Sequence, residues 1–226
     1  MRILIVAATD AEITPLTAQL REKSRIAPRA KQYEYHRHDL HILTTGVGMV
    51  ATAAWCSQML SHNRYDVAFN FGLCGAFDKV LELAQVVQVV SDRMADLGAE
   101  NDEDFLTVQE LKLLGDDEFP FTRGRLVNSS RPNNSSLAEL VTVDGITVST
   151  IHGNELSIAA VMSRFHPQVE SMEGAAFMYA CMIHRVPFAQ IRAVSNFVEK
   201  RNREAWKVTA AVNNLTKVGL RILAEL

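Results

Sequence analysis

The chain alternates short, apolar, β-branched segments with segments of helical pattern, and this alternation limits its fold more than any other feature. The apolar segments are typical of strands buried on both faces of a sheet: residues 2–8, 66–72, 84–94, 145–153 and 187–196. The helical patterns lie at residues 9–20, 46–62, 157–165, 172–184 and 202–226. Residues 33–45 suggest two more strands with a tight turn near Asp39, and residues 95–140 are mostly irregular. The pattern predicts an α/β fold with a central, mixed, largely parallel twisted sheet flanked by helices.

Composition narrows the class of protein. The 226 residues are 48% apolar, which suffices for one core, so we expect a single domain over residues 1–226. A net charge of −3 without a basic stripe argues against a nucleic-acid partner. The apolar run at the N-terminus has only six residues, too few for a secretion signal or a membrane span. Three cysteines fit free thiols in a reducing compartment, so we expect a cytoplasmic protein with no membrane partner.

Polar and glycine residues gather where the predicted strands end. Five such ends carry residue types that can bind or react: Ala8–Glu12, Thr45–Gly48, Asn70–Ala76, His152–Gly153 and Arg192–Asn196. In open α/β sheets, ligands bind beyond the carboxyl ends of the strands. A turn whose polar groups bond one another explains any one of these segments, but the five together predict one ligand site.

Two of these strand ends are rich in glycine. Residues 46–51 (GVGMVA) match the dinucleotide pattern GxGxxA, which would indicate an oxidoreductase. That pattern needs an acidic residue about 20 positions further on, at the end of the next strand, whereas Asp66 begins that strand. The glycines can equally bring backbone N–H groups close to another small or hydroxyl-rich ligand, starting at Gly46. Gly72 and Gly75 allow the same close approach.

Two other kinds of site have little support. Cys74 lies inside the second glycine turn without a histidine nearby in sequence, as is typical of a buried structural thiol. His36, His38 and His41 form the one histidine cluster, and no carboxylate or cysteine completes a metal-ligand pattern around them. We therefore expect neither a metal ion nor an organic cofactor.

Two segments carry more specific chemistry. Residues 169–181 (VESMEGAAFMYAC) place Glu173 at the start of an apolar helix. A carboxylate there either favours the helix N-terminus electrostatically or accepts hydrogen bonds from vicinal hydroxyls, such as those of a ribose. Arg192, Ser195 and Asn196 form a polar group at the end of an apolar strand. This group either binds the ligand or, through an asparagine cap, only orders the following turn.

Motifs spread over nearly the whole chain resemble the nucleoside phosphorylase and nucleosidase superfamily, and within it the methylthioadenosine/S-adenosylhomocysteine nucleosidase branch. They occur in the family's order: VAATDAEI, TGVGMVATAA, NFGLCGAF, VESMEGAAF and PFAQIRAVSN. Three further segments are similar to the futalosine hydrolases of the alternative menaquinone pathway: SDRMADLGAE, DEFPFT and VEKRNREAWK. The resemblance implies a single-domain, three-layer nucleoside phosphorylase-like fold, a small nucleoside substrate, no cofactor and a homodimer.

The resemblance also implies a role for each motif residue. In the nucleosidase branch a glutamate of the first loop activates water, and it corresponds to Glu12. A Met–Glu pair binds the ribose, and it corresponds to Met172 and Glu173. Asn196 then engages the purine, with Ser195 and Arg192 ordering its loop. Other residues bring backbone close to the nucleoside or line the base pocket: Gly46, Gly72, Leu73, Gly75 and, as an apolar wall from segment 152–156, Leu156.

Asn196 departs from the family, in which an aspartate at this position engages N7 of adenine. A protonated aspartate donates to N7 and accepts from the 6-amino group, whereas a 6-oxopurine presents two acceptors, N7 and O6. The asparagine amide can donate to both, and a pocket with the wrong donor pattern discriminates by roughly 10⁴-fold. Asn196 therefore predicts a hypoxanthine-type base, which agrees with futalosine as the substrate.

Water is the expected nucleophile rather than phosphate. Phosphorylases of this superfamily place an arginine in the first loop, whereas AATDAEITPL has no basic residue and Glu12 adds negative charge. The predicted reaction is hydrolysis of the N-glycosidic bond of futalosine, which releases hypoxanthine and dehypoxanthine futalosine. Four alternatives stay open: adenine release from methylthioadenosine, S-adenosylhomocysteine or aminodeoxyfutalosine; phosphorolysis of inosine; nucleoside binding without catalysis; and a dinucleotide-dependent oxidoreductase.

The 5′ substituent of the nucleoside is not fixed by these motifs. The apolar segment DEFPF, residues 117–121, is compatible with a dimer contact near the site. Its aromatic pair, Phe119 and Phe121, can equally pack within its own chain.

Overall fold

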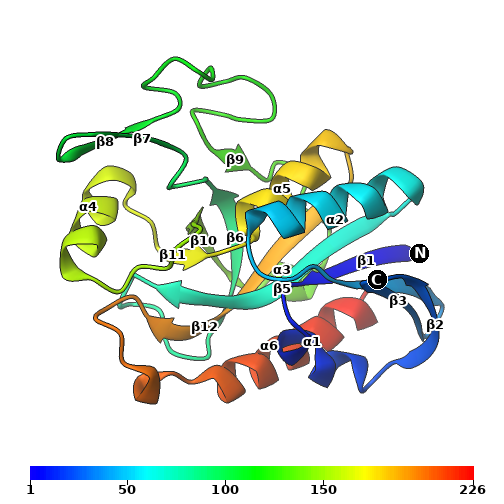
Figure 1. Cartoon of the computed structure of the whole chain (residues 1–226). Coiled ribbons are helices and arrows are strands. Elements are labelled where there is room, and N and C mark those ends of the chain that lie inside the picture. The colour runs from blue at the N-terminus through cyan, green and yellow to red at the C-terminus, as the bar shows by residue number, and fades with distance from the viewer.

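The computed structural model covers residues 1–226 and has a central sheet between two layers of helices (Figure 1). The strands are β1 (Arg2–Ala7), β2 (Arg21–Ala27), β3 (Ala30–Tyr35), β4 (His38–Thr44), β5 (Val67–Ala76), β6 (Val86–Asp92), β7 (Gly98–Asn101), β8 (Asp104–Thr107), β9 (Leu126–Val127), β10 (Val141–Thr147), β11 (Val169–Ser171) and β12 (Phe188–Phe197). The α-helices are α1 (Asp10–Thr17), α2 (Met49–His62), α3 (Ser135–Ala138), α4 (Glu155–Phe165), α5 (Gly174–Ile183) and α6 (Val208–Ala224), with a short 3₁₀-helix at Arg203–Ala205.

Ten strands form one mixed sheet in the order β11-β10-β6-β12-β5-β1-β4-β3-β2, with β9 paired to β6. Its middle is parallel, because β5 runs parallel to both β1 and β12, and β1 runs parallel to β4. Antiparallel pairs join β2, β3 and β4 at one edge and join β12 to β6 near the other. The predicted central mixed sheet flanked by helices is therefore confirmed.

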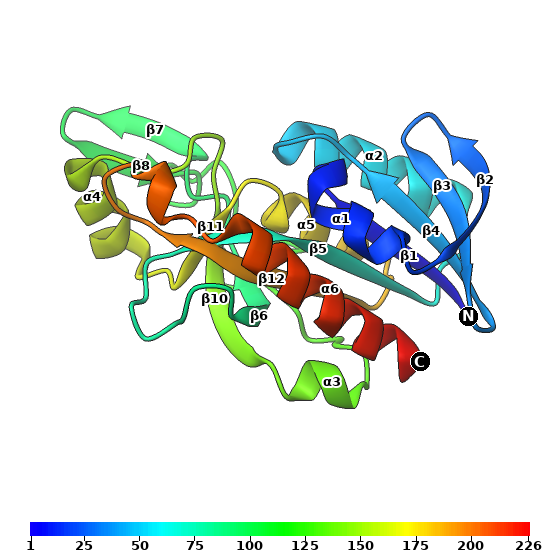
Figure 2. The same cartoon turned by 90° about the horizontal axis from the view of Figure 1, so that it is seen from below.

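Each face of the sheet has its own apolar core, which explains why RILIVA is apolar at almost every position. Ile3 and Ile5 of β1 belong to the core formed with α1 and α6. Leu4 and Val6, which alternate with them, belong to the core formed with α2 and α5. Figure 2 shows α6 and α1 crossing one face of the sheet, with α2 and α5 behind it.

Most predicted elements are present, but several boundaries differ. The turn expected near Asp39 lies instead at residues 36–37, where His36 takes a positive φ of 51°. The strand expected over residues 145–153 runs from Val141 to Thr147. β2 and β11 were not predicted, because β2 is polar and exposed and β11 has only three residues.

Residues 95–140, expected to be mostly irregular, hold only short elements. They contain the β7–β8 hairpin, which forms a separate two-stranded sheet, together with β9 and α3. No helix of the chain is long and apolar enough to cross a membrane.

Candidate active site

A cleft of about 540 Å³ lies at the carboxyl ends of β1, β5 and β12. All five polar strand ends contribute to its wall, through residues that include Glu12, Val47, Leu73, His152 and Asn196. β11 brings a further segment to it. This strand runs antiparallel to β5 with Glu170 opposite Gly75, so the chain beyond it carries Met172 and Glu173 back along β5.

Glu12 lies in the first turn of α1, three residues after the N-cap residue Thr9. Its Oε2 accepts hydrogen bonds from the backbone N–H and the hydroxyl of Thr9, both at 2.9 Å. Its Oε1 accepts a hydrogen bond from the N–H of Leu73 at 3.1 Å. Three donors thus hold the carboxylate in one orientation, and its remaining lone pairs can accept a hydrogen bond from a molecule in the cleft.

Glu173 is the N-cap residue of α5, and it is buried. Its Oε1 accepts a hydrogen bond from the N–H of Gly48 at 3.0 Å, and its Oε2 lies 3.7 Å from Nη1 of Arg192. Burial raises the pKa of this carboxyl, while Arg192 and the Gly48 N–H oppose the rise. Met172, the preceding residue, is half-buried and lines the cleft.

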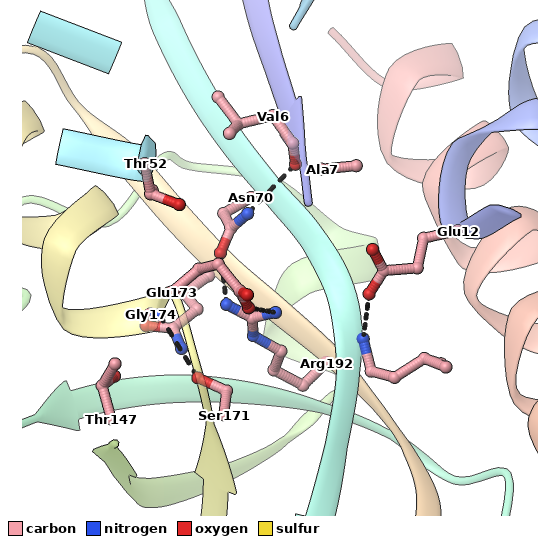
Figure 3. Close-up of polar contacts among 12 residues, drawn as sticks. Val6, Ala7, Glu12, Thr52, Asn70, Thr147, Ser171, Glu173, Gly174 and Arg192 are labelled. Atoms are coloured by element: carbon pink, nitrogen blue, oxygen red, sulfur yellow. Dashed lines mark hydrogen bonds and ion pairs between the residues drawn. The ribbon is translucent and has the colours of Figure 1, made fainter. Parts of the chain in front are cut away.

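Arg192 lies at the same end of the cleft as Glu12 and Glu173, which we call the Glu12 end. Its Nη2 donates to Oδ1 of Asn70 at 2.5 Å, and the Asn70 amide donates to the Val6 carbonyl at 3.1 Å (Figure 3). The prediction that Arg192 orders the Asn196 loop together with Ser195 is therefore wrong. Arg192 pairs with Gly72 of β5 and Asn196 pairs with Gly75, because a bulge at Ser195 shifts the register of β12. Gly72 and Gly75 are three positions apart on β5, so the side chains of Arg192 and Asn196 lie on opposite faces of the sheet.

Gly72 contributes to the Glu12 end without lining the cleft. A side chain at this position would overlap the Arg192 guanidinium and come within 3.2 Å of Oε1 of Glu12. The glycine therefore makes room for the arginine beside the carboxylate, instead of approaching the ligand itself as the sequence predicted.

Ser195 and Asn196 form the opposite end of the cleft, which we call the Asn196 end. The Ser195 hydroxyl donates to Oδ1 of Asn196 at 2.8 Å and lies 3.2 Å from the Cys74 carbonyl. The amide Nδ2 of Asn196 donates to the Phe197 carbonyl at 2.9 Å. These contacts fix the orientation of the amide and leave one N–H for a ligand, whereas the sequence argument counted two.

His152 and Glu170 form a pair at the Asn196 end that the sequence analysis did not single out as a unit. Glu170 is buried, and its Oε2 lies 2.7 Å from Nδ1 of His152. Its Oε1 accepts a hydrogen bond from the backbone N–H of His152 at 3.1 Å. Both residues line the cleft. A histidine at a predicted strand end was visible in the sequence, but its partner lay in a strand that was not predicted.

Like Gly72 and Arg192, two further predicted site residues lie outside the cleft wall. Leu156 is 82% exposed at the start of α4. That helix packs through a different stripe of its surface, formed by Ile158, Val161, Met162 and Phe165. Gly46 also lies outside the cleft wall, beside Arg29. The next two residues of that turn contribute to the site instead of Gly46. Val47 lines the cleft, and the Gly48 N–H donates a hydrogen bond to Glu173.

Asp92, at the end of β6, helps to hold the start of α5 next to the cleft. Its carboxylate accepts hydrogen bonds from the Thr147 hydroxyl at 3.0 Å, the Arg93 N–H at 2.8 Å and the Gln190 amide at 3.1 Å. Burial raises the pKa of Asp92 to about 6, and these hydrogen bonds oppose the rise. The Thr147 oxygen also accepts from the N–H of Ala175 at 2.7 Å. Asp92 and Thr147 therefore fix the first turn of α5, directly after Glu173.

Cys74 and His41, two residues weighed in the sequence analysis, are both buried in the structure. Burial raises the pKa of the Cys74 thiol to about 12, which disfavours the thiolate that a nucleophile needs. His41, of the histidine cluster, is buried with Nδ1 at 2.8 Å from the Tyr65 hydroxyl. No group of three or more His, Cys, Asp or Glu side chains is placed to hold a metal ion.

Comparison with known proteins agrees with this architecture. The family model described as the phosphorylase superfamily matches residues 2–225. A futalosine hydrolase of Thermus thermophilus is 31% identical, covering 81% of this chain and 80% of its own length. A futalosine hydrolase of Streptomyces coelicolor is also 31% identical, covering 77% of this chain and 74% of its own length.

A solved structure extends the comparison to the fold. The 5′-methylthioadenosine/S-adenosylhomocysteine nucleosidase of Colwellia psychrerythraea, solved in complex with adenine, superposes with a TM-score of 0.82. It covers 100% of this chain and 96% of its own, at 23% identity, and so compares the fold alone. With the cleft, the sheet order and the sequence identities taken together, the chain belongs to the phosphorylase superfamily, in the branch that contains the futalosine hydrolases.

Proposed function

We propose that the protein hydrolyses the N-glycosidic bond of futalosine, releasing hypoxanthine and dehypoxanthine futalosine in the alternative pathway of menaquinone synthesis. The observation that carries the proposal is one cleft with two carboxylates, Glu12 and Glu173, at one end and the Asn196 amide at the other. Carboxylates suit water activation and ribose hydroxyls, and an amide N–H suits a purine that carries oxygen at position 6. The two futalosine hydrolase relatives support this substrate.

The mechanism assigns the Glu12 end to the ribose and to water. Glu12 orients the attacking water and takes its proton, while its bonds to Thr9 and Leu73 keep the carboxylate in place. Glu173 accepts hydrogen bonds from the ribose hydroxyls, and Met172 packs on the sugar. Bond cleavage develops positive charge on the ribose, which the neighbouring carboxylates stabilise electrostatically.

The Asn196 end receives the leaving base in this mechanism. Asn196 donates its free N–H to the purine, while Ser195 holds the amide in that orientation. The backbone of Leu73 and Gly75 lines the cleft between the two ends, where it can lie against the nucleoside. The whole chain, residues 1–226, acts as one domain, and the reaction needs neither a metal nor an organic cofactor.

Water, not phosphate, is the nucleophile that we propose. The one arginine at the Glu12 end, Arg192, is buried and already contacts Asn70 and Glu173. A phosphate dianion at the Glu12 end would have to approach two carboxylates, and the arginine beside them is already paired. A phosphorylase role is therefore less well supported than hydrolysis.

Adenine release is the second candidate, because the fold is shared with a nucleosidase solved in complex with adenine. The Asn196 amide argues against it. Its Oδ1 already accepts from the Ser195 hydroxyl, so the amide is held to offer the base an N–H and not the acceptor that a 6-amino group needs.

We also propose a cytoplasmic homodimer that uses the segment around Phe119. Phe119 is 68% exposed and Leu113 is 76% exposed, whereas Phe121 packs against Tyr179 within the chain at a ring distance of 6.0 Å. Exposed apolar side chains close together in one long loop suit contact with a second copy. Light scattering at micromolar concentration tests this, and a Phe119→Asp variant that stays dimeric would contradict it.

The substrate proposal is tested by measuring base release from futalosine, inosine and methylthioadenosine in phosphate-free buffer. Rapid release of hypoxanthine from futalosine, with slow release from the other two, is the expected result. Adenine release from methylthioadenosine instead would show that the substrate is a 6-aminopurine nucleoside. A requirement for added phosphate would replace hydrolysis by phosphorolysis.

A further inference from the structure

The proposed function places a 6-oxopurine base at the Asn196 end of the cleft. Asn196 alone offers one hydrogen-bond donor too few for this base. A 6-oxopurine presents two acceptors side by side, N7 and O6. Asn196 has one N–H left, because its other N–H donates to the Phe197 carbonyl. A second donor must come from another group, since a buried acceptor left without a hydrogen bond weakens binding.

The strand register shows where this second donor can come from. Gly75 of β5 pairs with Asn196 of β12 on one side and with Glu170 of β11 on the other. Residues directly opposite each other in a sheet share a face, so the side chains of Glu170 and Asn196 flank the position where Gly75 has none. A Cβ at Gly75 would lie 2.9 Å from Cγ2 of Val198, 3.3 Å from Nδ2 of Asn196 and 3.6 Å from Cγ of Glu170. The missing side chain at Gly75 therefore makes room for Val198, and Glu170 and Asn196 lie near each other in the cleft wall.

Glu170 holds the imidazole of His152 in the same part of the cleft wall. The backbone N–H and Nδ1 of His152 both face the Glu170 carboxylate, at 3.1 and 2.7 Å. Phe77 packs edge-on against the ring at a centroid distance of 6.0 Å. Nδ1 is therefore committed to Glu170, and Nε2 is the ring nitrogen left to meet a ligand. For Nε2 to donate as well, the ring must carry a proton on both nitrogens, as an imidazolium paired with the Glu170 carboxylate.

We propose that His152, positioned by Glu170, is the second residue that recognises the base, and that its Nε2–H donates to O6 of a 6-oxopurine. This inference rests on the proposed function and deepens it. Asn196 then donates to N7, and His152 donates to O6 from the other side of Gly75. The pair of donors matches the two adjacent acceptors of the base.

The same contact assists bond cleavage. When the C1′–N9 bond breaks, its electron pair moves onto the purine, and part of the negative charge reaches O6. The oxygen of water bonds to C1′, and its proton goes to Glu12. A charged N–H at O6 stabilises the leaving base more strongly than it stabilises the bound substrate, which is the condition for catalysis.

The contact also discriminates between bases. A 6-amino group is itself a donor, so the Nε2–H of His152 would face another N–H and both would go unpaired. Purine, which carries only hydrogen at C6, would neither gain nor lose this contact. Comparison of hypoxanthine with purine therefore isolates the His152 contribution from the shape of the pocket.

The test measures the dissociation constants of hypoxanthine and purine by calorimetry in the wild type and in three variants. His152→Phe keeps a planar ring and removes the donor, His152→Gln restores an amide donor, and the exposed His62→Phe is the control. We expect His152→Phe to weaken hypoxanthine roughly 10-fold or more and purine by less than about 2-fold. His152→Gln should recover most of the loss, and His62→Phe should change neither constant.

Turnover of futalosine provides a second measurement. We expect kcat/KM of His152→Phe to fall roughly 10²-fold, as on loss of a charge-stabilising donor, with a smaller fall for His152→Gln. Equal weakening of both bases, or no weakening, would overturn the assignment of His152. A wild type that binds hypoxanthine no better than purine would overturn it as well.

These outcomes separate the inference from the proposed function. A wild type that prefers hypoxanthine through His152 but does not cleave futalosine would show that the substrate is wrong and the base contact is right. If His152→Phe does not fold, His152→Ala takes its place in the same measurement. A ratio of hypoxanthine to purine affinity that stays at the wild-type value in that variant would contradict the assignment.

Discussion

The two ends of the cleft are built differently. At the Glu12 end, each charged group has at least one partner from a distant part of the chain, such as the Gly48 N–H on Glu173 and the Leu73 N–H on Glu12. At the Asn196 end, the amide contacts only its sequence neighbours, Ser195 and Phe197. A substitution in a network that joins several strands and helices disturbs its other members, whereas a locally held amide can be replaced alone. The difference suggests that the Glu12 end fixes the reaction and the Asn196 end sets the base.

The strongest test of this division is the Glu12→Gln variant. Glutamine keeps the size of the side chain and can still accept the hydrogen bond of the Leu73 N–H, but it cannot take a proton from water. We expect kcat to fall by roughly 10²–10⁴-fold while the affinity for substrate stays within a few fold. Rapid-quench measurement of hypoxanthine release and calorimetric binding of the nucleoside check this. Turnover near the wild-type rate would remove Glu12 from the mechanism.

Gly72→Ala is expected to have the next largest effect. A Cβ at this position overlaps the guanidinium of Arg192, which is fully buried and cannot move without releasing Asn70 or Glu173. A displacement of about 1 Å in such a group can reduce the rate roughly 10²-fold, so we expect a loss of that order in kcat/KM. Gly115→Ala is the control, because its Cβ would meet only Glu118 at 3.5 Å. Equal activity of the two variants would mean that the Glu12 end tolerates rearrangement.

The same contrast explains what the sequence could predict. Glu12, Met172 and Glu173 lie in local motifs at strand ends, and the structure brings them together in one cleft as expected. The sheet and its helical layers follow from apolar runs such as residues 2–8 and 66–72, whose period and composition depend on short-range neighbours.

What the sequence could not predict depends on long-range register. The direction of the Arg192 side chain follows from which face of β12 meets Gly72. The pairing of His152 with Glu170 requires β11, a strand of three residues that no periodicity can reveal. The loss of one Asn196 donor depends on the backbone of Phe197, which no composition argument includes.

Asp92→Asn tests whether the Glu12 end also depends on the buried carboxyl below α5. Because folding raises the pKa of Asp92 from its ordinary 3.8 to about 6, the native state retains a proton that the unfolded chain releases. Stability from this group is therefore present below pH 4 and is lost as the pH rises from about 4 to 6. The gap between the two pKa values corresponds to about 3 kcal/mol.

The measurement for Asp92→Asn is urea unfolding at pH 4 and pH 7. Asparagine can accept from the Thr147 hydroxyl and donate to the unpaired Oε1 of Gln190, but it does not titrate. We expect the wild type to lose up to about 3 kcal/mol more than the variant between the two pH values. Other groups, including Glu173, titrate in both proteins and cancel in the comparison. Parallel pH profiles would show that Asp92 is ionised in the native state throughout this range.

Leu156→Ala carries the smallest expected effect and tests where the Asn196 end stops. Leu156 is 82% exposed and lies off the stripe through which α4 packs, so its truncation should change the free energy of unfolding by less than about 0.5 kcal/mol. We expect kcat/KM of Leu156→Ala on futalosine to stay within about twofold of the wild type. Met172→Ala is the matched truncation inside the cleft. It should reduce kcat/KM roughly tenfold, because it removes packing against the sugar. If kcat/KM falls as far in Leu156→Ala as in Met172→Ala, then α4 closes over the base when substrate binds. The Asn196 end would then extend beyond the residues that line the cleft in the free protein.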